Sequence, residues 1–282
     1  MQFSLTELFN DLPTVRIVDV GASPIDGPPP YQRLIDIKKA HVIGFEPDAA
    51  QYEALQKQPT SYSTYLPFAV GDGNDAVLNI CQAPGMTSLF EPDSEILGHF
   101  HGFAEWGTVV RREKIATRKL DEVEEVQAID YLKLDVQGSE LSIMLGAPRK
   151  LRQTLVVHTE VQFVPFYKEQ PLFAELDQEL RRAGFYLHRF TPLVSRLFKP
   201  VLVNNNIFSG LSQVLWSDAV YVKRFTEFEQ LSSESLLKIA LLLHELYGSF
   251  DFAALALGHI DRKDGTKRQA TYLQRLMSQA KP

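Results

Sequence analysis

Short apolar runs alternate along the chain with segments in which apolar residues recur every three or four positions. A short apolar run between turn residues predicts a buried strand, and the longer period predicts an amphipathic helix. The predicted strands span residues 14–20, 41–46, 62–70, 76–81, 129–136, 154–161, 186–190 and 219–223. Because strands that alternate with helices are typical of βαβ units, we predict an α/β fold with a doubly wound, mostly parallel sheet.

Polar residues and glycines mark the ends of the predicted helices. Asp48 can cap the helix that follows it, because its carboxylate can accept hydrogen bonds from free N–H groups of the first turn. Gly184 is placed to end an amphipathic helix. The predicted helices span residues 31–39, 49–57, 139–145, 172–183, 232–247 and 251–280. We expect residues 1–230 to form the main domain and residues 231–282 to form a helical appendage on it.

Residues 83–118 carry Gly, Pro and mixed charge without a clear period. Long irregular segments inside compact domains are often binding loops or lids, so we predict a long excursion that could close over a substrate. Its aromatic residues Phe100, Phe103 and Trp106 could stack on a sugar ring. The simpler interpretation is that they cover the sheet.

Charge and cysteine content exclude several classes of function. The chain has 29 basic and 35 acidic residues, a net charge of −6, which offers no general attraction for nucleic acid or anionic membranes. The single cysteine, Cys81, excludes an internal disulfide and is expected to be a small core residue. No apolar run approaches the roughly 18 residues that span a bilayer, and the N-terminal segment does not resemble a signal peptide. We therefore expect a cytoplasmic protein.

Acidic residues lie at or just past the carboxyl ends of the first three predicted strands, where a doubly wound sheet binds its ligand. Asp19-Val-Gly21-Ala22-Ser23 comes first, and its glycine lets the backbone approach a ligand while the carboxylate can hold a cationic or hydroxyl group. Glu46, before Pro47, is placed to accept the hydroxyls of a ribose, and Asp72 could meet an adenine amino group. The three sites together predict binding of a nucleoside with a positively charged side chain.

A dinucleotide is a weaker interpretation of the same segment. Its fingerprint needs glycines spaced as G-x-G-x-x-G before a helix that points at the phosphates. Only Gly21 and Gly27 are present here, and prolines follow. A nicotinamide-dependent dehydrogenase is therefore a distant alternative.

Two further groups of residues are candidates for catalysis. Asp135 closes an apolar strand, Gly138 permits a turn, and Glu140 falls in the first turn of the next helix, where it could also simply complement the helix dipole. In the next strand, alternation puts His158 and Glu160 on one face. A His and a Glu near a strand end suit general-base work, because the pKa of histidine is near neutral.

Seven blocks of the chain together resemble the FkbM-type methyltransferases over roughly residues 15 to 224. They are DVGAS (19–23), VIGFEPD (42–48), FAVGD (68–72), GMTSLFEP (85–92), KLD (119–121), IDYLKLDVQGSELSIMLGA (129–147) and VVHTEVQF (156–163). The resemblance implies a class I methyltransferase (Rossmann-like) fold with seven strands, the last antiparallel. It also implies S-adenosylmethionine as cofactor and O-methylation of sugars or polyketide-like natural products.

The same resemblance carries roles onto individual positions. Asp19, Gly21 and Ala22 match the first cofactor block, Glu46 matches the ribose ligand, and Asp135 and Glu140 match the acids of the family signature. The loop after Gly21 lacks the family's Asn-x-Gly. Gln137 stands where a Glu is usual, which removes one negative charge from the site.

The expected reaction is methyl transfer to a hydroxyl oxygen, and a base or a metal must help to remove its proton. We expect Asp135 and Glu160 to serve in this, with His158 as base or shared ligand. A divalent metal held by Asp135 and Glu160 is left open. The acceptor would be a small molecule or a glycan, and the C-terminal helices could form a homodimer. The leading alternative is a module that binds the cofactor, or a partner, without catalysis.

Overall fold

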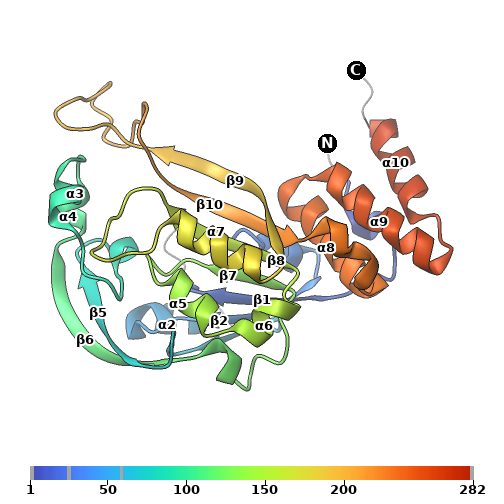
Figure 1. The fold of residues 1–282 in the computed structure, drawn as a ribbon, viewed down its shortest axis with the longest axis horizontal. Coiled ribbons are helices and arrows are strands. Elements are labelled where there is room, and N and C mark those ends of the chain that lie inside the picture. Colours follow the sequence, from blue (N-terminus) through green and yellow to red (C-terminus); the bar gives the residue numbers. More distant parts are fainter. Residues whose placement is uncertain (1–2, 24–26, 58–59, 280–282) are drawn as a thin grey trace.

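The main sheet is built from the apolar runs that the sequence marks as strands. The computed structural model describes residues 3–23, 27–57 and 60–279, and among these residues seven strands form one sheet in the order β3-β2-β1-β7-β8-β10-β9 (Figure 1). The strands are β1 (Val15–Val20), β2 (Ala40–Phe45), β3 (Ser63–Leu66), β7 (Tyr131–Leu134), β8 (Val156–Gln162), β9 (Phe185–Ser195) and β10 (Val214–Lys223). The last strand, β10, runs antiparallel to both of its neighbours. The predicted fold class is therefore confirmed.

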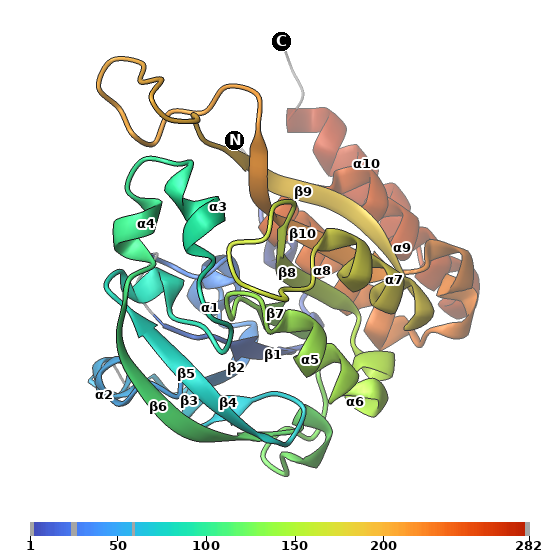
Figure 2. The same cartoon turned by 60° about the vertical axis from the view of Figure 1, so that its left-hand side comes forward.

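Helices cover both faces of this sheet (Figure 2). The α-helices are α1 (Gln32–Asp36), α2 (Ala49–Gln56), α3 (Ser94–Gly98), α4 (Phe103–Trp106), α5 (Glu140–Leu145), α6 (Pro148–Gln153), α7 (Phe173–Arg182), α8 (Ser233–Tyr247), α9 (Phe250–Asp264) and α10 (Arg268–Gln279). Short 3-10 helices are η1 (Leu5–Glu7), η3 (Pro84–Met86), η4 (Leu120–Glu122) and η5 (Phe225–Gln230). The Asp48 side chain caps α2 through the Gln51 N–H, as predicted.

Each face of the sheet has its own apolar core, because successive side chains of a strand point to opposite faces. On one face, Ile17 of β1 packs in a cluster with residues of α1, α8 and α9. On the other face, Val18 and Val20 pack with residues of α5, α6 and α7. The three C-terminal helices thus belong to the packing of the first face.

A second, three-stranded sheet corrects two predictions. Its order is β4 (Ala69–Val70), β6 (Val109–Arg118), β5 (Asp75–Cys81). The predicted single strand at 62–70 is wrong, since it divides into β3 and β4, which belong to different sheets. The predicted irregular excursion at 83–118 is also wrong in its last part, which forms β6. Burial alternates in the second half of β6, but its more buried positions are Glu113, Ile115 and Thr117, so the sequence shows no apolar alternation there.

The hairpin of β9 and β10 is much longer than the short strands predicted at 186–190 and 219–223. It extends beyond the body of the molecule (Figure 1). A third apolar cluster lies beside it, in which Phe100 and Phe103 are buried with Leu215 of β10. Cys81 is buried in the same cluster, which confirms the prediction of a core residue. No helix among the described residues is long and apolar enough to cross a membrane.

Candidate functional site

One face of the sheet changes from apolar to polar toward the carboxyl ends of the strands. Asp19 of β1 lies opposite Lys133 of β7, and Lys133 lies opposite His158 of β8. Two residues earlier on each strand, the same face carries side chains of the apolar core. Helix α8 ends at Tyr247, where Gly248 adopts the left-handed conformation. The polar row therefore borders a cavity instead of a helix.

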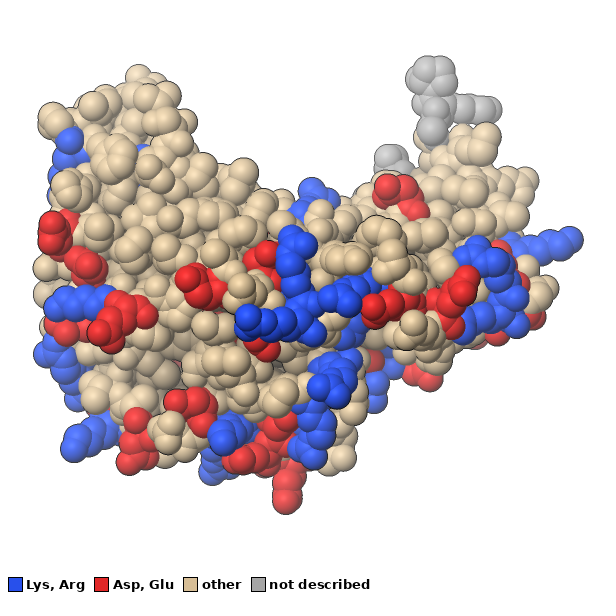
Figure 3. Space-filling view, in the orientation of Figure 1, with Lys and Arg blue, Asp and Glu red and all other residues tan. Residues whose placement is uncertain are grey.

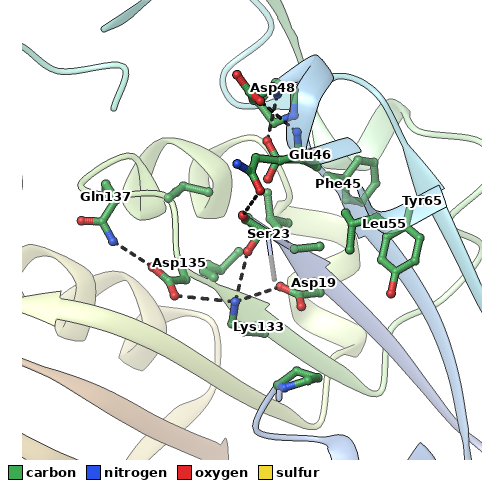
Figure 4. A pocket seen from close by; sticks show the side chains of 18 of the residues that line it. Asp19, Ser23, Phe45, Glu46, Asp48, Leu55, Tyr65, Lys133, Asp135 and Gln137 are labelled. Atoms are coloured by element: carbon green, nitrogen blue, oxygen red, sulfur yellow. Dashed lines mark hydrogen bonds and ion pairs between the residues drawn. The ribbon is translucent and has the colours of Figure 1, made fainter. Parts of the chain in front are cut away.

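That cavity has a volume of about 1060 Å³ and opens at the carboxyl ends of β1, β2 and β7 (Figure 4). Most of the predicted site residues line it: Asp19, Gly21, Ala22, Ser23, Glu46, Pro47, Asp135 and His158. Among the described residues, the cavity lining does not include Asp72, Glu140 or Glu160. The predicted loop after Gly21 can be followed only in part, because residues 24–26 lie outside the described residues.

Gly21 lets the chain turn sharply between β1 and the cavity. Its φ is +85°, and a Cβ atom there would lie 1.9 Å from the carbonyl oxygen of Asp135. No other residue fits so close a backbone approach. The carbonyl of Gly21 accepts a hydrogen bond from Lys133 Nζ at 3.2 Å. The glycine thus joins the turn after β1 to the end of β7.

Asp19 and Lys133 form a buried ion pair at the floor of the cavity. Asp19 Oδ2 accepts a hydrogen bond of 2.6 Å from the Tyr31 hydroxyl. Asp19 Oδ1 lies 3.1 Å from Lys133 Nζ, in a geometry that gives it no well-formed hydrogen bond among the described residues. Burial raises the pKa of Asp19 although Lys133 opposes the shift. The carboxylate is therefore held between the Tyr31 hydroxyl and the Lys133 ammonium group.

Lys133 also meets the second acid of the floor, with Nζ 3.6 Å from Asp135 Oδ2 (Figure 4). Burial lowers the pKa of Lys133, but Asp19 and Asp135 together outweigh burial and hold it above its ordinary value. The lysine is thus a fixed positive charge between two carboxylates. Sequence reasoning missed it, since a lysine inside a strand gives no signal until its register is known.

Glu46 follows β2 and is buried at the cavity wall. One of its oxygens accepts a hydrogen bond of 2.8 Å from the Asp48 N–H. Burial raises the pKa of Glu46 from 4.5 to about 7. Near neutral pH this group can therefore either donate a proton or accept ligand hydroxyls.

Glu140 and Glu160 lie behind the loop that carries Asp135. The Glu140 carboxylate accepts hydrogen bonds from the N–H groups of Val136 and Gly138, at 2.9 and 3.0 Å, and burial raises its pKa to about 7. Burial, reinforced by Asp135, raises the pKa of Glu160 well above its ordinary value. Both acids are thus held within the protein.

Gln137 connects this inner layer to the cavity. Its Nε2 donates at 3.0 Å both to Asp135 Oδ1 and to Glu160 Oε2. A neutral amide donor between two carboxylates lowers their mutual repulsion, whereas a glutamate at this position would add a third negative charge. Gln137, the residue that departs from the family pattern, therefore has a hydrogen-bond partner on each side, Asp135 and Glu160.

Asp72 lies apart from the other predicted cofactor residues. It is exposed, and its carboxylate accepts hydrogen bonds from the backbone N–H and the side-chain amide of Asn74, both at 2.9 Å. These bonds lower its pKa. The local geometry is that of an aspartate that closes its own turn.

A chain of hydrogen-bonding groups, which the sequence did not reveal, crosses the other side of the cavity. His158 Nδ1 lies 3.0 Å from the Tyr247 hydroxyl, which lies 2.8 Å from the Tyr131 hydroxyl. His158 Nε2 lies 3.2 Å from Asp218 Oδ2. Asp218 lines the cavity and remains partly exposed. We call these four residues the Tyr131–Asp218 relay.

The described residues include no group of three or more His, Cys, Asp or Glu side chains arranged to hold a metal ion. Asp135 and Glu160 are bridged by the Gln137 amide. The amide group of Gln137 thus lies between Asp135 and Glu160, where a metal ion shared by the two acids would bind.

One family model matches more than half of the chain. The model of the methyltransferase FkbM domain matches residues 19–187. A methyltransferase FkbM from Methylobacillus flagellatus KT is 16% identical, with a TM-score of 0.43 over 78% of this chain and 46% of that chain. Magnesium protoporphyrin IX methyltransferase from Synechocystis PCC 6803, solved with bound SAM, is 13% identical, with a TM-score of 0.37 over 76% and 73% of the two chains. The chain thus spans less than half of the first of these structures. A comparison with curated proteins found no match.

Proposed function

Since the chain belongs to the methyltransferase FkbM domain family, we propose that it transfers a methyl group from S-adenosylmethionine to a hydroxyl oxygen of a sugar-containing or related natural-product acceptor. The observation that carries this proposal is the meeting of Asp19, Glu46 and Asp135 around one cavity. At about 1060 Å³, its volume is at the upper end of ligand sites. It has room for a nucleoside and for part of an acceptor.

The residues of the cavity fit the proposed cofactor. Asp19 and Asp135 both border the cavity and share the single positive charge of Lys133, so the two carboxylates can also attract a ligand ammonium group. Glu46 stands at the end of β2, where a carboxylate can accept both hydroxyls of a ribose. Gly21 brings the backbone close to the same space. These three features support a nucleoside with a cationic side chain.

For the proton of the acceptor we propose Asp218 as the base. When bound, S-adenosylmethionine supplies an electrophilic methyl group on a positively charged sulfur. The acceptor hydroxyl must lose its proton as its oxygen attacks, and a nearby base speeds that loss. The proton passes from the acceptor oxygen to the Asp218 carboxylate. His158 Nε2, 3.2 Å from Asp218 Oδ2, holds this carboxylate in position.

The relay explains why Asp218, and not His158, is the better acceptor of the proton. With Asp218 ionised, His158 is best placed when its Nε2–H donates to that carboxylate. Its Nδ1 then accepts from the Tyr247 hydroxyl, so both ring nitrogens are engaged. Tyr131 can in turn donate to Tyr247. Both His158 and Asp218 line the cavity, but the Asp218 side chain is 39% exposed against 7% for His158.

The remaining predicted residues fit supporting roles in this proposal. Asp135 and His158 line the cavity and are placed to contact the acceptor or cofactor. For Glu140 and Glu160 we propose that they fix the loop of Asp135 and Gln137 through the bonds described above. Asp72, outside the cavity, is not needed for the cofactor.

Binding and turnover test the proposal separately. S-adenosylhomocysteine should raise the melting temperature of the native protein in proportion to RT ln(1 + [L]/Kd), and NAD should not compete. Asp19→Asn should weaken this effect, whereas Asp72→Asn should leave it unchanged. Labelled S-adenosylmethionine should then transfer its methyl group to a hydroxyl of a glycan or glycolipid panel. Loss of all nucleoside binding would overturn the proposal, and binding without transfer would favour a non-catalytic module.

A further inference from the structure

Exposed apolar side chains gather on the hairpin formed by β9 and β10. We call residues 186–217 the hairpin arm. Half of the large apolar residues that are exposed in the described chain lie on it: Leu193, Phe198, Val201, Leu202, Val203, Phe208 and Leu211. The last two are 58% and 80% exposed. A concentration of this kind is unusual on the surface of a monomer and marks an interaction site.

The charge of the arm is opposite to that of the whole chain. From residue 180 to residue 217 there is no Asp or Glu, although the chain has 35 acidic residues in 282. The arm itself carries Arg189, Arg196 and Lys199. Figure 3 shows the projecting part of the molecule as an almost wholly uncharged lobe without acidic groups. The net charge of the chain hides this local pattern.

The arm grows out of the edge of the sheet at which the cavity opens. Asp218, which lines the cavity, directly follows the arm. The third apolar cluster connects the two, because Leu215 of the arm packs in it with Cys81 and Met86. Both Cys81 and its neighbour Ile80 border the cavity. A surface bound by the arm would therefore lie beside the cavity mouth.

Aromatic residues of the segment 83–118 pack against the arm. Trp106 stacks on Phe208 with ring centroids 5.8 Å apart, and Phe100 stacks on Phe198 at 5.0 Å. The His101 ring lies 3.0 Å from the carbonyl of Val201. Helices α3 and α4 thus brace the arm in its projecting position.

We propose that the hairpin arm docks on an anionic lipid surface and that the acceptor hydroxyl belongs to an amphiphile held in that surface. This inference rests on the proposed methyl transfer for its acceptor part. The apolar side chains enter the interfacial region, while Lys199, which is exposed, faces the anionic headgroups. Pairing two copies of the arm would instead bring like charges together, which disfavours a symmetric dimer.

Vesicle co-sedimentation tests the docking. The full chain is mixed with vesicles of phosphatidylcholine alone or mixed with phosphatidylglycerol, and the bound fraction is measured at low and high salt. We expect binding to the mixed vesicles that weakens with salt, and a loss of at least about tenfold in Phe208→Ser/Leu211→Ser. Lys199→Glu should reduce binding to the mixed vesicles only. Met277→Ser, which alters a residue 76% exposed on α10, is the matched control and should bind like the wild type.

The outcomes separate this inference from the proposed function. Absence of wild-type sedimentation, or equal losses in the arm and control variants, would overturn the docking. A dimer by light scattering that the arm variants abolish, without vesicle binding, would assign the arm to a second copy and also overturn it. S-adenosylhomocysteine binding should persist in every variant, since none lines the cavity. Methylation of soluble sugars, but not of vesicle-borne glycolipids, would refute the acceptor part while leaving methyl transfer intact.

Discussion

Titration of Glu46 should control how tightly the cavity binds a nucleoside. Burial raises the pKa of this carboxyl from 4.5 to about 7, although the Asp48 N–H donates to one of its oxygens. Ribose hydroxyls donate best to the ionised carboxylate and would therefore favour loss of its proton. Affinity for S-adenosylhomocysteine should accordingly increase as the pH rises through neutrality.

The size of the effect follows from the coupling of proton and ligand binding. If the bound hydroxyls return the pKa of Glu46 from about 7 to about 4.5, protonation weakens binding by a factor near 1 + 10^(7−pH). This factor is about 11 at about pH 6 and about 1.1 at about pH 8. The dissociation constant should thus fall about tenfold over this interval.

Calorimetric titration with S-adenosylhomocysteine across this pH range measures the effect directly. Glu46→Gln should abolish the pH dependence and bind more weakly than the wild type above neutrality. Asp72→Asn, which removes an exposed acid outside the cavity lining, should keep the wild-type slope. A flat wild-type profile would refute the reasoning, and a slope that survives in Glu46→Gln would assign it to another group.

The raised pKa of Glu46 also makes the stability of the folded protein depend on pH. The pKa of Glu46 is raised in the folded protein, so its contribution is most favourable below about pH 4.5 and is lost as the pH rises to about 7. The raised pKa corresponds to about 3 kcal/mol of lost stability above neutrality. Glu46→Gln should recover part of this, seen as a smaller drop in unfolding free energy between acidic and neutral pH.

Further substitutions test the relay and the turn after β1. Asp218→Asn should lower kcat about 100-fold or more, as expected for loss of a general base, with S-adenosylhomocysteine affinity unchanged; a larger loss in His158→Gln would make the histidine the base instead. Tyr247→Phe removes two hydrogen bonds of the relay, to His158 and to Tyr131, and should lower kcat about three- to tenfold and stability by about 2 kcal/mol; unchanged kcat would separate Tyr247 from the reaction. Gly21→Ala, with a Cβ 1.9 Å from a carbonyl oxygen, should destabilise the protein by about 3 kcal/mol or more in denaturant titration. Gly27→Ala, with a φ of +90° but open space, should lose only about 1 kcal/mol, and equal losses would contradict the steric argument.

The sequence predicts most of the sheet because its strands are buried apolar runs. It fails at β6, where the more buried positions carry Glu113 and Thr117 beside Ile115, so that apolar and polar residues do not alternate. It also fails at residues 62–70, where β3 and β4 follow each other closely but join different sheets. The pattern of apolar residues along a segment shows how the segment is buried. It does not show which sheet a strand joins, because that depends on the partner strand.

The same limit explains which site residues the sequence could predict. Asp19 lies near the carboxyl end of a parallel strand, and Glu46 and Asp135 directly follow theirs, so their chain position alone assigns them to the edge that binds ligands. Asp218 lies within β10 and before its buried end. Because β10 is antiparallel to β8, where Asp218 lies opposite Glu160, the early part of this strand meets the carboxyl end of its neighbour. Only knowledge of the strand's direction could have revealed it.

The C-terminal helices determine where the polar part of the sheet begins, although the sequence separates them as an appendage. Leu236 and Ile239 of α8 pack in one cluster with Ile17 of β1, and Lys238 Nζ lies 3.2 Å from the buried carboxylate of Asp130. The helix ends at Tyr247, whose hydroxyl contacts His158 at 3.0 Å. Because the same helix fills the apolar half of this face and stops beside the polar row, its length sets the boundary between core and cavity. Tyr247 at the end of α8 is therefore as much a part of the proposed site as the acids at the carboxyl ends of the strands.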